Sequence, residues 1–211
     1  MSTKLPTILE ITKDLCYTVV RSNKRKDKRL MKLLICSDIH GDAKCTEKVL
    51  SAFVAEGADK IVILGDILYH GPRNDLPENY APKRVIELLN GYRDKILAVR
   101  GNCDTEVDQM VLSFPVLADY AILSLDGLTV YATHGHVYNT SNPPPLCTGD
   151  ILLHGHTHVR CITPFGDNNT YINPGSVTLP KENNPKTYMV YENRNFKIKG
   201  FDGNIVLEKS F

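Results

Sequence analysis

The stretch "KLLICSDIHG", residues 32–41, joins an apolar run to side chains that can bind a metal ion. Apolar residues in unbroken succession, without polar alternation, are typical of a strand buried on both faces of a sheet. The run leads into Asp38 and His40, whose carboxylate and imidazole are both common metal ligands. Because they are two residues apart at one strand end, both side chains can reach the same site. The stretch therefore predicts a buried strand with a polar site at its carboxyl end.

The same arrangement recurs four more times along the chain. The apolar runs "KIVIL", "KILAV", "LTVYAT" and "DILL" lead into Gly65-Asp66, residues 100–104, residues 134–136 and the histidine cluster 154–158. Helical patterns over about 43–56 and 82–90 separate the first three runs, which predicts a βαβαβ unit. Ligands of open α/β sheets bind at the carboxyl ends of the strands, so we expect the five polar tips to share one edge.

Four short segments follow without helical patterns between them: "TYIN", "TYMVYE", "FKIKGF" and "NIVLEK". They predict a second, mostly antiparallel sheet that packs on the first. The predicted fold class is therefore α/β, a two-sheet β-sandwich flanked by helices.

Composition limits the class of protein further. The chain has 211 residues, of which 42% are hydrophobic and 23% charged, as in an ordinary globular domain. The formal net charge of +1 is unevenly distributed, since residues 1–30 carry +5 and residues 31–211 carry −4. We predict an N-terminal extension and basic linker over 1–30 and one domain over 31–211. The acidic domain argues against a nucleic-acid partner.

Cysteine usage and hydropathy indicate a cellular compartment. None of the six cysteines is arranged as C-x-x-C, and several lie within apolar runs. This pattern favours reduced thiols and a cytoplasmic chain. No run of 18 apolar residues occurs, so we expect no membrane partner.

The strand tips supply seven oxygen or imidazole donors: Asp38, His40, Asp66, Asn102, His134, His156 and His158. One zinc ion needs only three or four ligands, so seven suit two ions that share a carboxylate. Such pairs, ~3.5–4 Å apart, occur in phosphate-ester hydrolases. Period-2 geometry would also point His154, His156 and His158 to one side if their strand continued.

Five motifs in this order resemble the calcineurin-like metallophosphoesterases: "DIH" at 38–40, "GD" at 65–66, "GN" at 101–102, "THGH" at 133–136 and "GHTH" at 155–158. The likeness spans residues 31–211 and is greatest to the bacterial YfcE-type phosphodiesterases, through "ILGDILYHGPRN" and "AVRGNCDTEVDQM". The resemblance implies α/β/β/α layers and hydrolysis of phosphodiesters by in-line attack of a metal-bound hydroxide.

The resemblance also implies which residues hold the ions. One ion would be bound by Asp38, His40, Asp66 and His158. The second would be bound by Asp66, Asn102, His134 and His156, with Asp66 bridging. This donor set and the resemblance favour Mn²⁺, with Zn²⁺, Fe²⁺, Co²⁺ or Ni²⁺ as alternatives. The resemblance implies no role for His154, which we expect to lie in the core.

Three further residues are candidates for catalysis: Cys103, His136 and Arg100. Many family members carry a histidine where this chain has Cys103, and that histidine is taken to protonate the leaving group. The thiol could donate a proton instead, or be a small residue that leaves room for a bulky diester. His136 is a candidate substrate contact. Arg100 could bind phosphate or form a salt bridge, and Asp104 is expected to orient a neighbour.

Two other functions stay open. A phosphomonoesterase or nucleotidase would use the same metal site. A non-catalytic scaffold is the other, because a retromer subunit of this fold serves as an interaction platform. The expected partner is a small phosphodiester substrate, and a homo-oligomer is left open.

Overall fold

The computed structural model describes residues 31–211, so the predicted extension over 1–30 lies outside the described residues. The strands are β1 (Leu33–Cys36), β2 (Lys60–Ile63), β3 (Ile96–Ala98), β4 (Tyr120–Leu125), β5 (Leu128–Thr133), β6 (Ile151–His154), β7 (Cys161–Phe165), β8 (Asn169–Asn173), β9 (Thr187–Glu192), β10 (Asn195–Gly200) and β11 (Ile205–Ser210). The helices are α2 (Ala43–Glu56), α3 (Pro82–Asn90), α4 (Glu106–Val111) and the 3₁₀ turn η1 (Arg93–Lys95).

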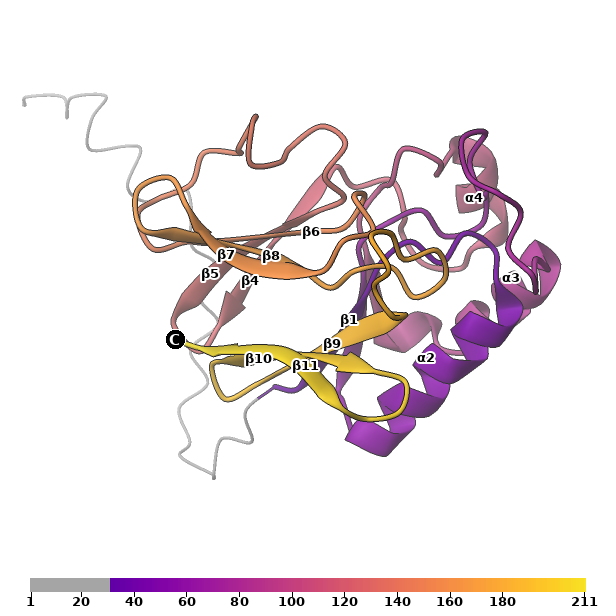
Figure 1. The fold of residues 1–211 in the computed structure, drawn as a ribbon. Coiled ribbons are helices and arrows are strands. Elements are labelled where there is room, and N and C mark those ends of the chain that lie inside the picture. The colour runs from indigo at the N-terminus through magenta and orange to yellow at the C-terminus, as the bar shows by residue number, and fades with distance from the viewer. Residues whose placement is uncertain (1–30) are drawn as a thin grey trace, which may run out of the picture.

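The predicted βαβαβ unit is confirmed. Strands β1, β2 and β3 pair in parallel, and α2 and α3 connect them over the predicted ranges. Both helices lie on the same outer face of this sheet (Figure 1). Helix α2 begins after Asp42, whose carboxylate accepts a hydrogen bond from Cys45 N at 2.8 Å. It buries Val49 and Phe53 against β1 and β2 in a hydrophobic core that includes Leu34 and Ile63.

The prediction for the last three strands was wrong in one respect, because they extend the first sheet instead of the second. The order in this six-stranded sheet is β11-β10-β9-β1-β2-β3, with β9 antiparallel to β1. The first five residues of β9, Thr187 to Tyr191, are all buried. A strand buried on both faces belongs inside a covered sheet, and the centre of the first sheet, between β10 and β1, is such a place.

The second sheet has five strands in the order β4-β5-β6-β8-β7 and is mixed. Strands β5, β6 and β8 run parallel, while β4 and β7 pair antiparallel at the two edges. Apolar residues from both sheets fill the space between them, including Ile35, Val62, Val130, Leu153 and Ile172. The two-sheet α/β sandwich is thus confirmed.

The expected helical layer on the second sheet is not found among residues 31–211. Helices of this part of the chain cover only the first sheet (Figure 1). Residues 134–150, which connect β5 to β6, include three consecutive prolines at 143–145. Proline in a helix interior removes a hydrogen bond and clashes with the preceding turn, so this connection cannot be helical. It contacts the outer face of the sheet instead, where Tyr131 donates a hydrogen bond to Pro145 O.

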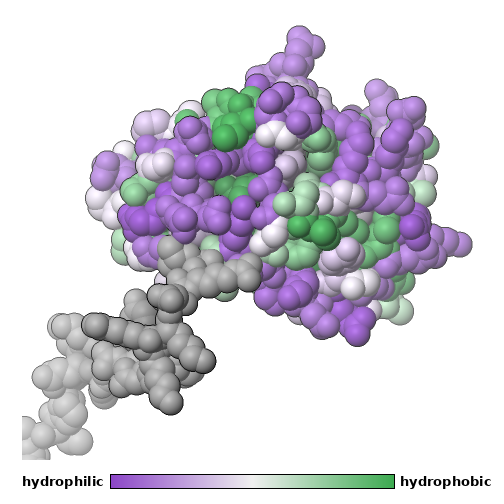
Figure 2. All heavy atoms as spheres, turned by 90° about the horizontal axis from the view of Figure 1, so that it is seen from below, coloured by the Kyte–Doolittle hydropathy of each residue, from purple (hydrophilic) through white to green (hydrophobic). Residues whose placement is uncertain are grey.

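The surface of the described residues is mixed. On the visible part of the face in Figure 2, hydrophobic residues form small groups separated by hydrophilic ones. No helix within residues 31–211 has both the length and the apolar character needed to cross a membrane. The five cysteines of this region are free, and Cys36, Cys45 and Cys103 are buried.

His154, the last residue of β6, is a core residue as expected. Its ring is 3% exposed and stacks on Tyr171 with 4.3 Å between ring centroids. Burial lowers the pKa of His154 to about 4, because the charged imidazolium would lose its hydration. The residue is therefore neutral in the folded protein near neutral pH.

This histidine predicts a pH dependence of folding. Its pKa is near 6.5 when unfolded and about 4 when folded, so the unfolded state binds more protons between these values. Stability contributed by the neutral ring is present above about pH 6.5 and is lost as the pH falls through this window. We expect His154→Phe to keep the stacking and to reduce this loss. The measurement is the urea midpoint of metal-free protein at about pH 7 and pH 4.5. An equal fall in both proteins would contradict it.

Candidate metal centre

The five polar strand tips meet at one edge of the sandwich, as predicted. Three tips follow β1, β2 and β3 of the first sheet, and two follow β5 and β6 of the second. Backbone hydrogen bonds join the first two tips, with His40 N donating to Asp66 O at 2.9 Å. A further bond crosses between the sheets, from His156 N to Asp38 Oδ2 at 3.1 Å.

Most of the predicted ligands have an unusual backbone conformation. Five of the seven have left-handed φ angles: Asp38 (58°), His40 (49°), Asp66 (55°), His156 (64°) and His158 (62°). A non-glycine residue in this region costs about 1 kcal/mol or more, and persists only where its surroundings impose it. Such strain clusters at functional sites, so its concentration here supports a site independently of the side chains.

The left-handed residues also overturn the expectation that His154, His156 and His158 point to one side. Strand β6 ends at His154, and the chain then turns through His156 and His158. The three rings therefore go to three places. His154 faces the outer core, whereas His158 lies beside His40 and His156 beside His134.

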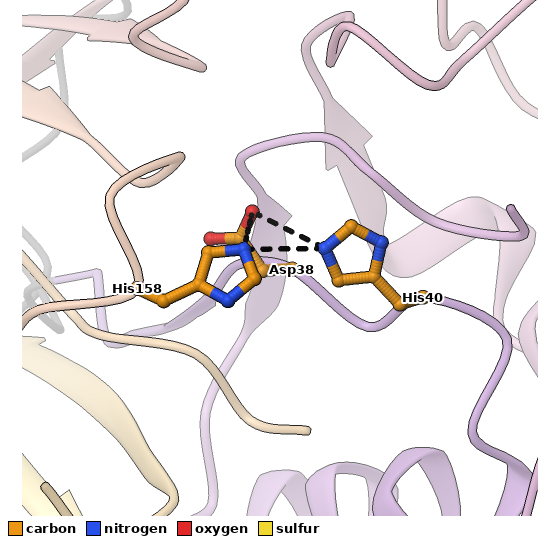
Figure 3. A group of neighbouring side chains, drawn as sticks. All are labelled: Asp38, His40 and His158. Carbon is orange, nitrogen blue, oxygen red and sulfur yellow. Dashed lines mark hydrogen bonds and ion pairs between the residues drawn. The ribbon is translucent and has the colours of Figure 1, made fainter. Parts of the chain in front are cut away.

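The first donor group contains Asp38, His40 and His158 (Figure 3). The two histidine Nε2 atoms are 3.3 Å apart, and Asp38 Oδ1 lies 3.3 Å from that of His158 and 3.8 Å from that of His40. Asp38 is fully buried, and its Oδ1 has no hydrogen bond from the described residues. Burial alone would raise the pKa of Asp38, but the imidazole of His158 outweighs it and holds the pKa well below its usual range.

The backbone fixes which nitrogen of each histidine faces the site. In three rings Nδ1 lies within hydrogen-bonding distance of a carbonyl oxygen: His40 with Tyr69 O (2.8 Å), His134 with Leu64 O (2.6 Å) and His158 with Leu179 O (2.5 Å). A carbonyl can only accept, so each Nδ1 donates its proton. In a neutral ring Nε2 then carries a lone pair, which is the form that binds metal.

This donor set suits a cation. Burial lowers the pKa of His40 and favours its neutral form, so its Nε2 lone pair faces the Nε2 of His158. Burial would lower the pKa of His158, but its hydrogen bond to Asp38 raises it, and one proton on Nε2 would be shared between Asp38 Oδ1 and His40 Nε2, each 3.3 Å away. A divalent ion would satisfy all three donors at once. The residues present therefore fit a metal ion.

The second donor group contains Asp66, Asn102, His134 and His156. His134 Nε2 lies 3.1 Å from Asn102 Oδ1, 3.1 Å from His156 Nδ1 and 3.5 Å from Asp66 Oδ2. Burial, assisted by the neighbouring His134, lowers the pKa of His156 to about 4. These four donors thus converge beside one carboxylate, and the imidazole of His156 is neutral near neutral pH.

Asp66 connects the two groups. Its Oδ2 lies 3.7 Å from His40 Nε2 in the first group and 3.5 Å from His134 Nε2 in the second. Its Oδ1 accepts a hydrogen bond from Cys103 N at 2.8 Å, which orients the carboxylate. One oxygen facing two donor groups is the arrangement that a bridging ligand needs. The structure therefore brings the seven predicted side chains close together, and their division into two sets of ligands stays a prediction.

Asp104 holds this arrangement in place, as the sequence predicted for it. Its carboxylate accepts hydrogen bonds from the backbone N–H groups of Asp66 (2.8 Å), Ile67 (2.9 Å) and Gly101 (2.7 Å). It thereby ties the loop after β2 to the loop after β3. The two loops approach so closely that a Cβ on Gly101 would lie 2.1 Å from Asp66 Oδ1. Only glycine fits at this position.

Cys103 is buried beside the donor groups. Its Sγ accepts a hydrogen bond from Asn102 Nδ2 at 3.2 Å and lies within 4.8 Å of ligand atoms of His40 and Asp66. Burial, with a contribution from Asp66, raises the pKa of the Cys103 thiol. The residue is therefore a neutral thiol in the metal-free protein, and not the thiolate that nearby cations would favour.

Arg100 and His136 lie at the margin of the site. The guanidinium of Arg100 donates to Asp104 O at 3.2 Å and lies 3.9 Å from Glu106, so the salt-bridge alternative is the one present. His136 is exposed, with its ring 5.4 Å from that of His134. Their roles toward substrate stay predictions.

A cavity of about 340 Å³ opens over the donor groups, and its lining adds residues from two other segments. Arg73 and Asn74 come from the Gly-Pro loop after β2. Lys181 was not predicted, because a single exposed lysine carries no sequence signal.

Comparison with known proteins identifies the family. Residues 31–195 match the family model of the calcineurin-like phosphoesterase superfamily domain. Phosphodiesterase YfcE of Escherichia coli K12 is 48% identical over 164 residues, which cover 78% of this chain and 89% of that protein.

Solved structures agree with this result. The structure of YfcE, a phosphoesterase from E. coli, superposes with a TM-score of 0.82 at 45% identity, covering 85% of this chain and 99% of that one. An archaeal phosphodiesterase, 21% identical with a TM-score of 0.59 over 83% of this chain and 100% of its own, shares the fold. With its five motifs at the strand tips and these matches, the chain belongs to the calcineurin-like phosphoesterase superfamily.

Proposed function

We propose that residues 31–211 form a phosphodiesterase that works with two divalent metal ions. One observation carries this proposal: Asp66 Oδ2 lies between two donor groups, 3.7 Å from His40 Nε2 and 3.5 Å from His134 Nε2. Paired ions that share a carboxylate are typical of phosphate-ester hydrolysis. The first ion would be held by Asp38, His40, Asp66 and His158, and the second by Asp66, Asn102, His134 and His156.

The enzyme class is that of a metal-dependent phosphodiester hydrolase. Membership of the phosphoesterase superfamily and 48% identity to a named phosphodiesterase support it. Oxygen and imidazole donors fit Mn²⁺ well, and the resemblance favours it, with Zn²⁺, Fe²⁺, Co²⁺ and Ni²⁺ as alternatives. A small phosphodiester is the proposed substrate, and cytoplasmic location stays a proposal.

The ions would activate water and neutralise negative charge on the phosphoryl oxygens. The residues of the chain supply the remaining requirements. Main-chain carbonyls hold His40, His134 and His158 with Nε2 toward the site, so little reorganisation is needed on binding. Cys103 is placed next to Asn102 and Asp66, where its neutral thiol can donate a proton to the departing oxygen.

The first test is an assay on metal-stripped protein with Mn²⁺ added back. Bis(p-nitrophenyl) phosphate should be cleaved only when Mn²⁺ is present, and faster than p-nitrophenyl phosphate. His134→Ala should lower this activity by more than about 100-fold, because it removes a direct donor and not only a supporting residue. His154→Phe is the matched control and should keep full activity.

Other outcomes would select other functions. Cleavage of the monoester alone would establish the phosphatase alternative. No cleavage with Mn²⁺, Zn²⁺, Co²⁺ or Ni²⁺ would exclude the enzyme and favour the scaffold.

Asp104→Asn tests how the loops hold the donors. The amide nitrogen cannot accept a hydrogen bond, so at least one of the backbone N–H groups of Asp66, Ile67 and Gly101 loses its partner. We expect Mn²⁺ affinity, measured by calorimetry, to fall about 10- to 100-fold. An unchanged affinity with a lowered melting temperature would show that Asp104 serves only the fold.

Cys103→Ala separates a proton donor from a space-filling residue. A p-nitrophenolate leaving group departs without a proton, whereas an alkoxide needs one. If the thiol is the acid, kcat/KM should fall by about 100-fold for a dialkyl diester and stay unchanged for the aryl diester. Equal retention of both activities would assign Cys103 to space filling.

A further inference from the structure

Two cavities adjoin at the metal centre and share a wall. The cavity over the donor groups has a volume of about 340 Å³, and its lining includes His156, Thr157 and Lys181. A second cavity of about 370 Å³ lies between Tyr69 and Cys103. Arg73, Asn74 and Asn102 line both cavities. The shared wall gives the centre two compartments, as a diester with two different arms requires.

Arg73 and Lys181 are the cations that line the first compartment, where Arg73 stands in the wall shared with the second, and both are anchored to the metal centre. Tyr69, which begins the loop of Arg73, offers its carbonyl to His40 Nδ1 at 2.8 Å, and Asn74 Nδ2 donates to His70 O at 2.8 Å within the same loop. Lys181 N donates to His158 O at 3.2 Å. Each cation therefore sits on a segment bonded directly to a ligand of the first donor group.

Neither of these two charged side chains interacts with another described residue through an ion pair or a hydrogen bond. Among residues 31–211, the guanidinium of Arg73 and the ammonium of Lys181 have no ion-pair or hydrogen-bond partner, and both residues are exposed. By contrast, Arg84 pairs with Glu47 and Glu87, and Arg100 lies near Glu106. Two unpaired cations beside one cavity produce a local positive field that attracts anions.

The negative charge of the reacting phosphate does not account for the two cations Arg73 and Lys181. Two bound divalent ions would carry four positive charges, which the carboxylates of Asp38 and Asp66, an attacking hydroxide and a singly charged diester would together balance. We propose that the compartment of Arg73 and Lys181 binds a second anionic group, a carboxylate or a phosphate, on the arm that stays attached after cleavage. The leaving arm then occupies the compartment beside Cys103. This proposal rests on the function proposed above and names its substrate class.

The test compares four p-nitrophenyl diesters with one leaving group. Their second arms are ethyl, 2-carboxyethyl, 2-phosphonooxyethyl and 2-aminoethyl, and the measured quantity is kcat/KM with Mn²⁺. Wild type should cleave both anionic probes fastest and the 2-aminoethyl probe slowest. Arg73→Gln and Lys181→Gln should each lower kcat/KM for the anionic probes by about fivefold and leave the ethyl probe within about twofold. Comparison of the carboxylate with the phosphate probe identifies the preferred anion.

Lys95→Gln is the matched control. Lys95 is exposed and ends η1, immediately before the amino end of β3, so it lies at the edge of the sheet opposite the site. It should change none of the four rates. Equal rates for the ethyl and anionic probes in wild type would overturn the proposal. An equal loss on all four probes in Arg73→Gln would do the same, because it would place Arg73 on the reacting phosphate.

A binding measurement separates this proposal from the function on which it rests. If no probe is cleaved, the proposed hydrolase fails, but the compartment can still be tested. Calorimetry with Mn²⁺-supplied protein should show tighter binding of 2-carboxyethyl phosphate than of ethyl phosphate, and the difference should disappear in Lys181→Gln. Equal binding, or binding of neither, would refute the anion compartment.

Discussion

The arrangement of the whole site depends on the carboxylate of Asp66. Its Oδ1 accepts from Cys103 N, which leaves Oδ2 between His40 and His134. To place this group, β2 must end beside both β1 and β3, and Gly101 must let the next loop pass within contact distance. Asp104 then fixes the two loops together through three backbone amides. Much of the backbone at this edge is thus arranged around one oxygen atom.

The same edge accumulates groups that are costly to bury. Asp38 is fully buried with an oxygen that lacks a hydrogen bond, and burial raises the pKa of Asp104 to about 6. Left-handed φ angles at Asp38, His40 and Asp66 add strain. A hydrophobic interface between the sheets supplies the stability that offsets these terms. The destabilising groups lie at one edge, whereas the stabilising apolar contacts extend over the whole interface between the sheets.

Local pattern predicted much of this molecule. Apolar runs that end in Asp38, Asp66 or His134 predicted the strands, and the carboxyl ends of the neighbouring parallel strands β1 and β2 explain why the first two tips lie together. The sheet to which β9 belongs was not predictable in this way, since pairing partners are set by burial over long sequence distances. The left-handed turns at His156 and His158 were missed for a related reason. Backbone conformations imposed by tertiary contacts leave no periodic signal in the sequence.

The contacts that aim His40, His134 and His158 are made by the carbonyls of Tyr69, Leu64 and Leu179. Every amino acid has a carbonyl, so these three positions can accept other residues over evolution without loss of the contact, provided that the backbone keeps its path. Mutational tolerance should then be high at the exposed Tyr69, limited to apolar residues at the fully buried Leu64, and almost absent at the glycines that shape the loops. The orientation of these three histidine rings therefore depends on the path of the main chain more than on the identity of the residues that supply the carbonyls.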